Sequence, residues 1–146
     1  MCIRDRFYAG NNEEMIIKNT FLRKLLLVAT VGLFSQFAVA QDAATTAAAK
    51  QVADIVASLN HFPSDADKAT LGAISGNAQL PQGLRDMATA VANIQHAATA
   101  EDKVTLAAIQ ANDTVPDAGK ALAGIIAGIN HTASADAKTQ LAQLFP

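Results

Sequence analysis

A sequence pattern repeats at an interval of 35 residues, and the three histidines of the chain mark it: His61, His96 and His131. A lysine follows each histidine seven residues later, and a leucine follows ten residues later. Self-similarity at an interval of this size is typical of repeat proteins, in which each unit is one supersecondary element packed on its neighbours. The sequence therefore predicts three similar units, at about 47–81, 82–116 and 117–146.

Each unit has the pattern of two short helices. The first helix carries apolar residues at helical spacing, which in the first unit are Val52, Ile55, Val56 and Leu59. A hydroxyl side chain suited to an N-cap precedes each second helix, at Ser64, Thr99 and Ser134. The pattern predicts six helices and no strand, at about 47–60, 65–76, 82–95, 100–111, 117–130 and 135–145. We expect an all-α fold, with three helical hairpins stacked as a small right-handed solenoid or bundle.

Two kinds of residue predict special backbone geometry. Asn77 and Asn112 follow the second helices, and asparagine tolerates the left-handed conformation that often ends a helix. Gly124 and Gly128 lie one turn apart in a predicted helix, where glycine is unfavourable. We expect the two glycines to allow close approach by another backbone, within the chain or from a second copy.

The N-terminal part of the chain has the features of a secretory signal. Residues 1–14 match neither the signal nor the repeat, and we interpret them as an artefactual or disordered extension. In residues 15–40 a basic start precedes an apolar stretch that ends at Ala38-Val39-Ala40, a small-residue cleavage pattern. A membrane anchor is the alternative, but the apolar stretch is short for a span of about 20 residues. We expect cleavage after Ala40 and a secreted or periplasmic helical-repeat domain at 41–146.

Composition restricts the partners of this domain. From Gln41 onward the chain has 10 acidic and 6 basic residues, without a basic cluster. Binding to nucleic acid or to an anionic membrane surface depends on such clusters, so we expect neither. The one cysteine, Cys2, lies in the N-terminal extension, which leaves the domain without a disulfide or a thiolate ligand. The 28 alanines of the domain predict a thin core with closely packed helices.

The histidines allow two interpretations. In the one that we favour, each imidazole lies at the C-terminal end of a first helix and hydrogen bonds a free carbonyl group. In the other, His61, His96 and His131 are metal ligands. Stacked units would place equivalent residues roughly 10 Å apart, so one ion would not be shared. Each histidine would then need a nearby carboxylate, such as Asp65 or Asp67 beside His61.

No motif of the chain predicts an enzyme or a bound cofactor. The sequence has no glycine-rich phosphate loop, and the acidic pairs near the second helices suit helix starts better than acid–base catalysis. The repeated lysines Lys68, Lys103 and Lys138 are typical of a solvated helix face. We therefore expect an exported binding or scaffold protein whose ligand is a protein, a peptide or another copy of the chain. The alternative is a periplasmic metal-binding protein that uses the repeated histidine.

Overall fold

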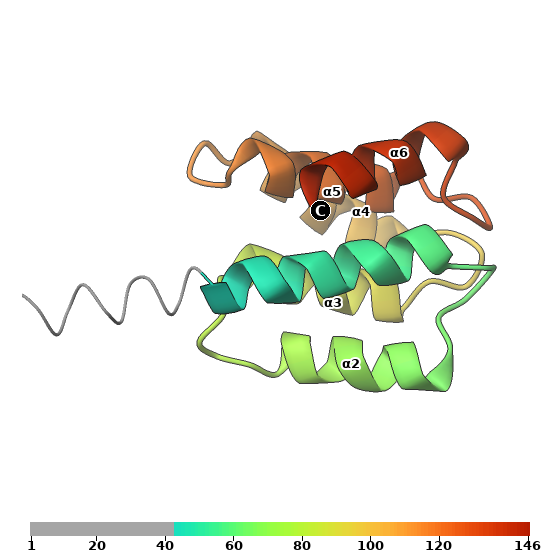
Figure 1. Cartoon of the computed structure of the whole chain (residues 1–146), viewed down its shortest axis with the longest axis horizontal. Coiled ribbons are helices and arrows are strands. Elements are labelled where there is room, and N and C mark those ends of the chain that lie inside the picture. Colours follow the sequence, from blue (N-terminus) through green and yellow to red (C-terminus); the bar gives the residue numbers. More distant parts are fainter. Residues whose placement is uncertain (1–42) are drawn as a thin grey trace, which may run out of the picture. The chain divides into compact units, whose positions relative to one another are not determined.

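The computed structural model describes residues 43–146, and this part of the chain is all-helical. It contains six helices and no strand, as predicted. The first helix covers residues 43–58 and is the cyan helix of Figure 1. The others are α2 (Asp65–Ser75), α3 (Gln82–Ala92), α4 (Ala100–Ala111), α5 (Asp117–Ala127) and α6 (Ala135–Leu144).

The second helix of each unit begins at the predicted N-cap. The side-chain oxygens of Ser64, Thr99 and Ser134 each accept a hydrogen bond of 3.1 Å from the backbone N–H three residues later. At Ser64 the cap is reciprocal, because the Asp67 carboxylate accepts a bond from the Ser64 backbone N–H at 3.1 Å. These bonds satisfy N–H groups that would otherwise lack partners at a helix start.

The first helix of each unit ends two or three residues before the predicted position. The ends lie at residue 58, Ala92 and Ala127. Beyond each end the backbone N–H of an isoleucine or leucine bonds the carbonyl three residues earlier, at 3.2–3.4 Å. This spacing tightens the last turn, and the chain then leaves the helix.

Small and branched side chains at equivalent positions form the core. Ala53, Ala88 and Ala123 are all buried, so the same close helix contact recurs in each unit. The largest fully buried side chains come from all three units: Val52, Val56, Pro63, Leu71, Val91, Ile94, Leu106, Leu122 and Ile126. One apolar core therefore joins the units, since no unit buries its helix faces alone.

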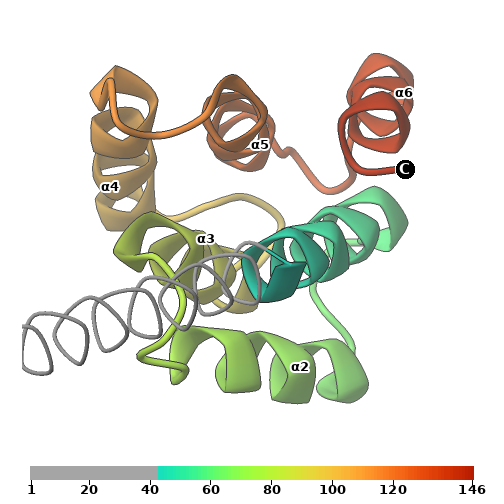
Figure 2. The same ribbon diagram turned by 60° about the vertical axis from the view of Figure 1, so that its left-hand side comes forward.

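Each second helix packs on the first helix of the following unit. Helix α2 contacts α3, and α4 contacts α5 in the same way. Helix α6, the second helix of the third unit, lies beside the first helix of the first unit in both views (Figures 1 and 2). The Lys50 side-chain amine donates a bond of 3.0 Å to the Phe145 carbonyl and so joins the first helix to the C-terminal end of the chain.

The units therefore close on themselves and do not form an open stack. In an open solenoid of three units, the first unit would contact only the second. Here the third unit also contacts the first, through the Lys50–Phe145 bond and the bond from the His61 backbone N–H to the His131 carbonyl. The predicted all-α fold with paired helices is confirmed for residues 43–146, whereas the predicted right-handed solenoid is not confirmed.

Within the described chain Gly124 does not face another backbone, so the predicted close contact inside the chain is wrong there. A Cβ atom at Gly124 would lie 3.2 Å from Oε1 of the flexible Gln110 side chain. Gly128 is the C-cap of α5 and not an interior helix residue.

The predicted extension at 1–14 and the predicted signal peptide at 15–40 lie outside the described residues. Within the described range, no helix combines the length and the apolar character that crossing a membrane requires.

Candidate metal centre

The three histidines lie in equivalent loops between the first and second helices of their units. None of the three is a helix cap: the C-caps of α3 and α5 are Asn93 and Gly128, and His96 and His131 follow three residues later. The predicted position at a helix C-terminus is therefore wrong. The reason is the early helix end, which transfers each histidine into the loop.

A closed ring of backbone hydrogen bonds joins the three loops. His61 donates its backbone N–H to the His131 carbonyl at 2.6 Å, and His131 donates to the His96 carbonyl at 2.5 Å. His96 donates to the His61 carbonyl at 2.7 Å and so closes the ring. Each histidine donates once and accepts once, which gives the loops an approximate three-fold arrangement. Units 35 residues apart in sequence meet at one point because of this ring.

The same three residues have the left-handed backbone conformation. Their φ angles are 68° at His61, 75° at His96 and 67° at His131, and no other non-glycine residue in the range 43–146 has a positive φ. Asn77 and Asn112, which were expected to adopt it, therefore do not. At His61 and His131 the residue after the histidine donates its N–H to the carbonyl of the residue before it, at 2.8 and 2.9 Å. This is the tight three-residue turn with positive φ, a rare and strained form.

The imidazole rings gather at the centre of this arrangement. The ring centroids are 5.3 Å apart for His61 and His96, and 5.1 Å apart for each of the other two pairs. All three pairs meet edge to face, and all three residues are exposed. The expected separation of about 10 Å is thus wrong, because it assumed units stacked in a line.

One ring nitrogen from each histidine is available at close range. These three nitrogen atoms all lie within 4.8 Å of one another. A point in their centre is then at most about 2.8 Å from each nitrogen, compared with about 2.0–2.1 Å in a zinc–imidazole bond. Small side-chain rotations would close that difference. Three imidazoles and one free position form the ligand set of an open four-coordinate site.

Neighbouring amide side chains orient two of the imidazoles. Nδ1 of His61 lies 2.7 Å from the Asn60 side-chain oxygen, and Nδ1 of His131 lies 2.7 Å from that of Asn130. An amide oxygen only accepts, so Nδ1 carries the proton in each case and Nε2 keeps its lone pair for an ion. The bonding partner is thus a side chain in the loop, and not the helix carbonyl that we expected.

Carboxylates do not join the cluster. Among the described residues, the group within metal-binding reach consists of His61, His96 and His131. The Asp67 carboxylate accepts bonds from the backbone N–H and the hydroxyl of Ser64, at 3.1 and 2.7 Å, in its role at the helix start. The expected pairing of His61 with an aspartate is therefore replaced by contact among the histidines.

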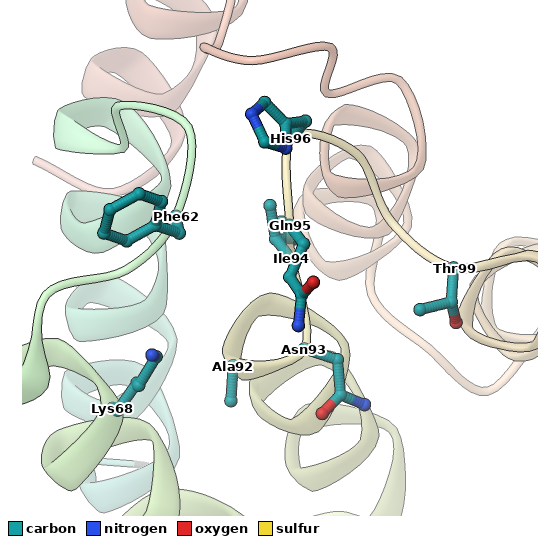
Figure 3. A pocket seen from close by; sticks show the side chains of 8 residues that line it. All are labelled: Phe62, Lys68, Ala92, Asn93, Ile94, Gln95, His96 and Thr99. Atoms are coloured by element: carbon teal, nitrogen blue, oxygen red, sulfur yellow. The ribbon is translucent and has the colours of Figure 1, made fainter.

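A cavity of about 540 Å³ opens beside the histidine cluster. Phe62 and Lys68 form one side of it and the segment 92–96 faces them, with His96 at its edge (Figure 3). Thr99 completes the lining. Lys68 lines this cavity, whereas Lys103 and Lys138 do not. The sequence pattern alone did not distinguish the three lysines.

Comparison with known proteins identifies no similar protein. No protein-family model matches the chain, and no curated protein or solved structure matches it either. The geometry of the histidine cluster and its surroundings is therefore the basis for a functional proposal.

Proposed function

We propose that the protein binds one divalent transition-metal ion through His61, His96 and His131. The observation that carries this proposal is the approach of three imidazole nitrogens to within 4.8 Å of one another. Imidazole suits zinc, copper and nickel, whereas magnesium and calcium prefer oxygen ligands. The absence of a carboxylate from the described cluster thus favours the transition metals.

The backbone ring alone does not account for three histidines. Its hydrogen bonds use only N–H and carbonyl groups, which every residue other than proline provides. Glycine or asparagine would adopt the positive φ at lower cost. The imidazoles are exposed and contribute little to the core. A residue type that is unfavourable for the backbone and unnecessary for packing supports a role of the side chain itself.

The proposed role is binding and transfer of the ion, without catalysis. The three histidines are exposed and lie apart from the buried helical core. An exposed ion with a free coordination position exchanges readily with another ligand. Together with the signal sequence expected at 15–40, this suggests a protein that buffers or delivers metal in the periplasm or outside the cell.

Metal titration tests the proposal. We expect one zinc, copper or nickel ion per chain, with a dissociation constant of about 1 μM or lower, which is about 8 kcal/mol of binding free energy. Cobalt should give the visible absorption of a four-coordinate site. The triple variant His61→Asn, His96→Asn, His131→Asn should lose this binding and keep its helical circular dichroism, because asparagine tolerates positive φ.

The stoichiometry gives a second criterion. Binding of three independent ions per chain would indicate separate sites at each histidine and contradict a shared site. Unchanged binding by the triple variant would assign the ion to other residues.

A second candidate function is binding of a protein, a peptide or another copy of the chain. It is supported by two large apolar side chains that remain exposed, Phe62 at 60% and Val104 at 71%. Exposed aromatic residues are common in binding surfaces. Light scattering tests self-association, and the variant Phe62→Thr, which copies Thr132 of the third unit, should abolish any dimer that uses this surface.

A further inference from the structure

The cavity beside the cluster shares one residue with it. His96 contributes a ring nitrogen to the metal-binding group and also lines the cavity. Figure 3 shows the His96 imidazole at the edge of the space between Phe62 and the end of α3. A molecule in this cavity would therefore lie beside His96, which is one of the three residues proposed to hold the ion.

The lining has the chemistry of a site for a small anion with an apolar body. Lys68 supplies a positive charge, and Phe62 supplies an exposed aromatic face. Gln95 adds a side-chain amide, whose N–H groups can donate hydrogen bonds to ligand oxygen atoms. The volume of about 540 Å³ falls within the usual range of small-molecule sites.

Two carboxylates near the cavity are already bound to other groups. Asp102 is buried and accepts bonds from the Thr99 hydroxyl at 2.7 Å and from the Asn93 amide at 3.5 Å. Asp67 is bound to Ser64. Neither carboxylate lines the cavity, whereas Lys68 does. The positive charge of Lys68 is therefore the side-chain charge that a ligand in the cavity would meet.

The three units differ at this point although their backbones are alike. The residue after the histidine is Phe62 in the first unit, Ala97 in the second and Thr132 in the third. An aromatic wall is therefore present at the junction of the first and second units alone. A symmetric role in loop structure does not require this difference, but a single ligand site does.

We propose that this cavity binds a small organic carboxylate, whose oxygen supplies the fourth ligand to the ion. This inference rests on the proposed metal site. Lys68 balances the charge of the carboxylate, and Phe62 contacts its apolar part. Because metal and carboxylate touch, each raises the affinity for the other by the same factor.

Titration of benzoate into the full chain, with and without zinc, tests this inference. Benzoate should bind the zinc-loaded protein at least about tenfold more tightly than the zinc-free protein, as expected for coupled sites. Benzamide, which is neutral and of similar shape, should bind weakly to both. The variant Lys68→Met should lose most of the benzoate affinity, whereas Lys103→Met, the same change one unit later, should not.

Each component has its own readout. Failure of zinc to bind in the first titration would overturn the metal site and this inference with it. Zinc binding with equal affinity for benzoate and benzamide, or equal effects of Lys68→Met and Lys103→Met, would overturn the carboxylate site and leave the metal site intact. Both lysines are exposed, so the variants should keep the fold, and unchanged helical circular dichroism in both variants will verify it.

Discussion

The helices and the histidine loops of this protein differ in how well the observed backbone conformation matches the local preference of the residues. In the helices, local preference and final structure agree: hydroxyl caps begin α2, α4 and α6, and alanine fills the contacts between units. In the loops they conflict, because three residues that are not glycine have positive φ. Such conflicts cost about 1–3 kcal/mol each and cluster at functional sites. The comparison supports the proposal that the helices stabilise the fold and that the histidine loops hold a metal ion.

The largest effect is expected from breaking the helical part. Leu106 of α4 is fully buried, and the variant Leu106→Ala should lower the free energy of unfolding by about 2–5 kcal/mol through lost burial and a cavity. Val104→Ala in the same helix is the matched control, because Val104 is exposed. Its effect should stay within about 0.5 kcal/mol in denaturant unfolding. Equal effects of the two variants would contradict the assigned core.

The next effect concerns the loops and should leave stability unchanged. Asn60 and Asn130 hold the imidazoles of His61 and His131, and loss of such a partner typically lowers metal affinity about 10–100-fold. Asn60→Ala and Asn130→Ala should each have this effect on zinc binding by competition titration. Gln95 is the control: within residues 43–146 no corresponding bond to His96 is present, so Gln95→Ala should change zinc affinity less than threefold, about 0.6 kcal/mol.

A larger loss in Gln95→Ala than in the two asparagine variants would contradict this assignment of the orienting groups. A loss of stability in Asn60→Ala comparable to that of Leu106→Ala would remove the distinction between the two regions.

The sequence predicts the helical part well because its signals are local. The interval of 35 residues, the apolar spacing around Val52 and Val56, and the caps at Ser64 and Thr99 each act within one or two turns. These signals determine where a helix begins and which face it buries. The helix ends were predicted less well because the backbone at each histidine has a positive φ and is bonded to the other two loops, which no local pattern shows.

The sequence grouped the three histidines but did not predict their geometry. The repeat identified His61, His96 and His131 as a group, but their distances depend on whether three units form a line or a ring. That choice follows from long-range contacts, such as the one between Lys50 and Phe145, which no local pattern contains. The position of Lys68 beside a cavity also depends on contacts between units, because residues of the second unit complete the cavity.

The smallest effect is expected from a helix position that, like the histidine positions, has a residue type unfavourable for its backbone conformation. Gly72 lies inside α2, where the equivalent residues of the other units are Ala107 and Ala142. A Cβ atom at Gly72 would meet no atom within 4 Å. The variant Gly72→Ala should therefore raise the free energy of unfolding by about 1 kcal/mol, because alanine loses less backbone entropy in a helix. Zinc affinity should stay unchanged. A decrease in stability would show that Gly72 has a structural role that its place inside α2 does not explain.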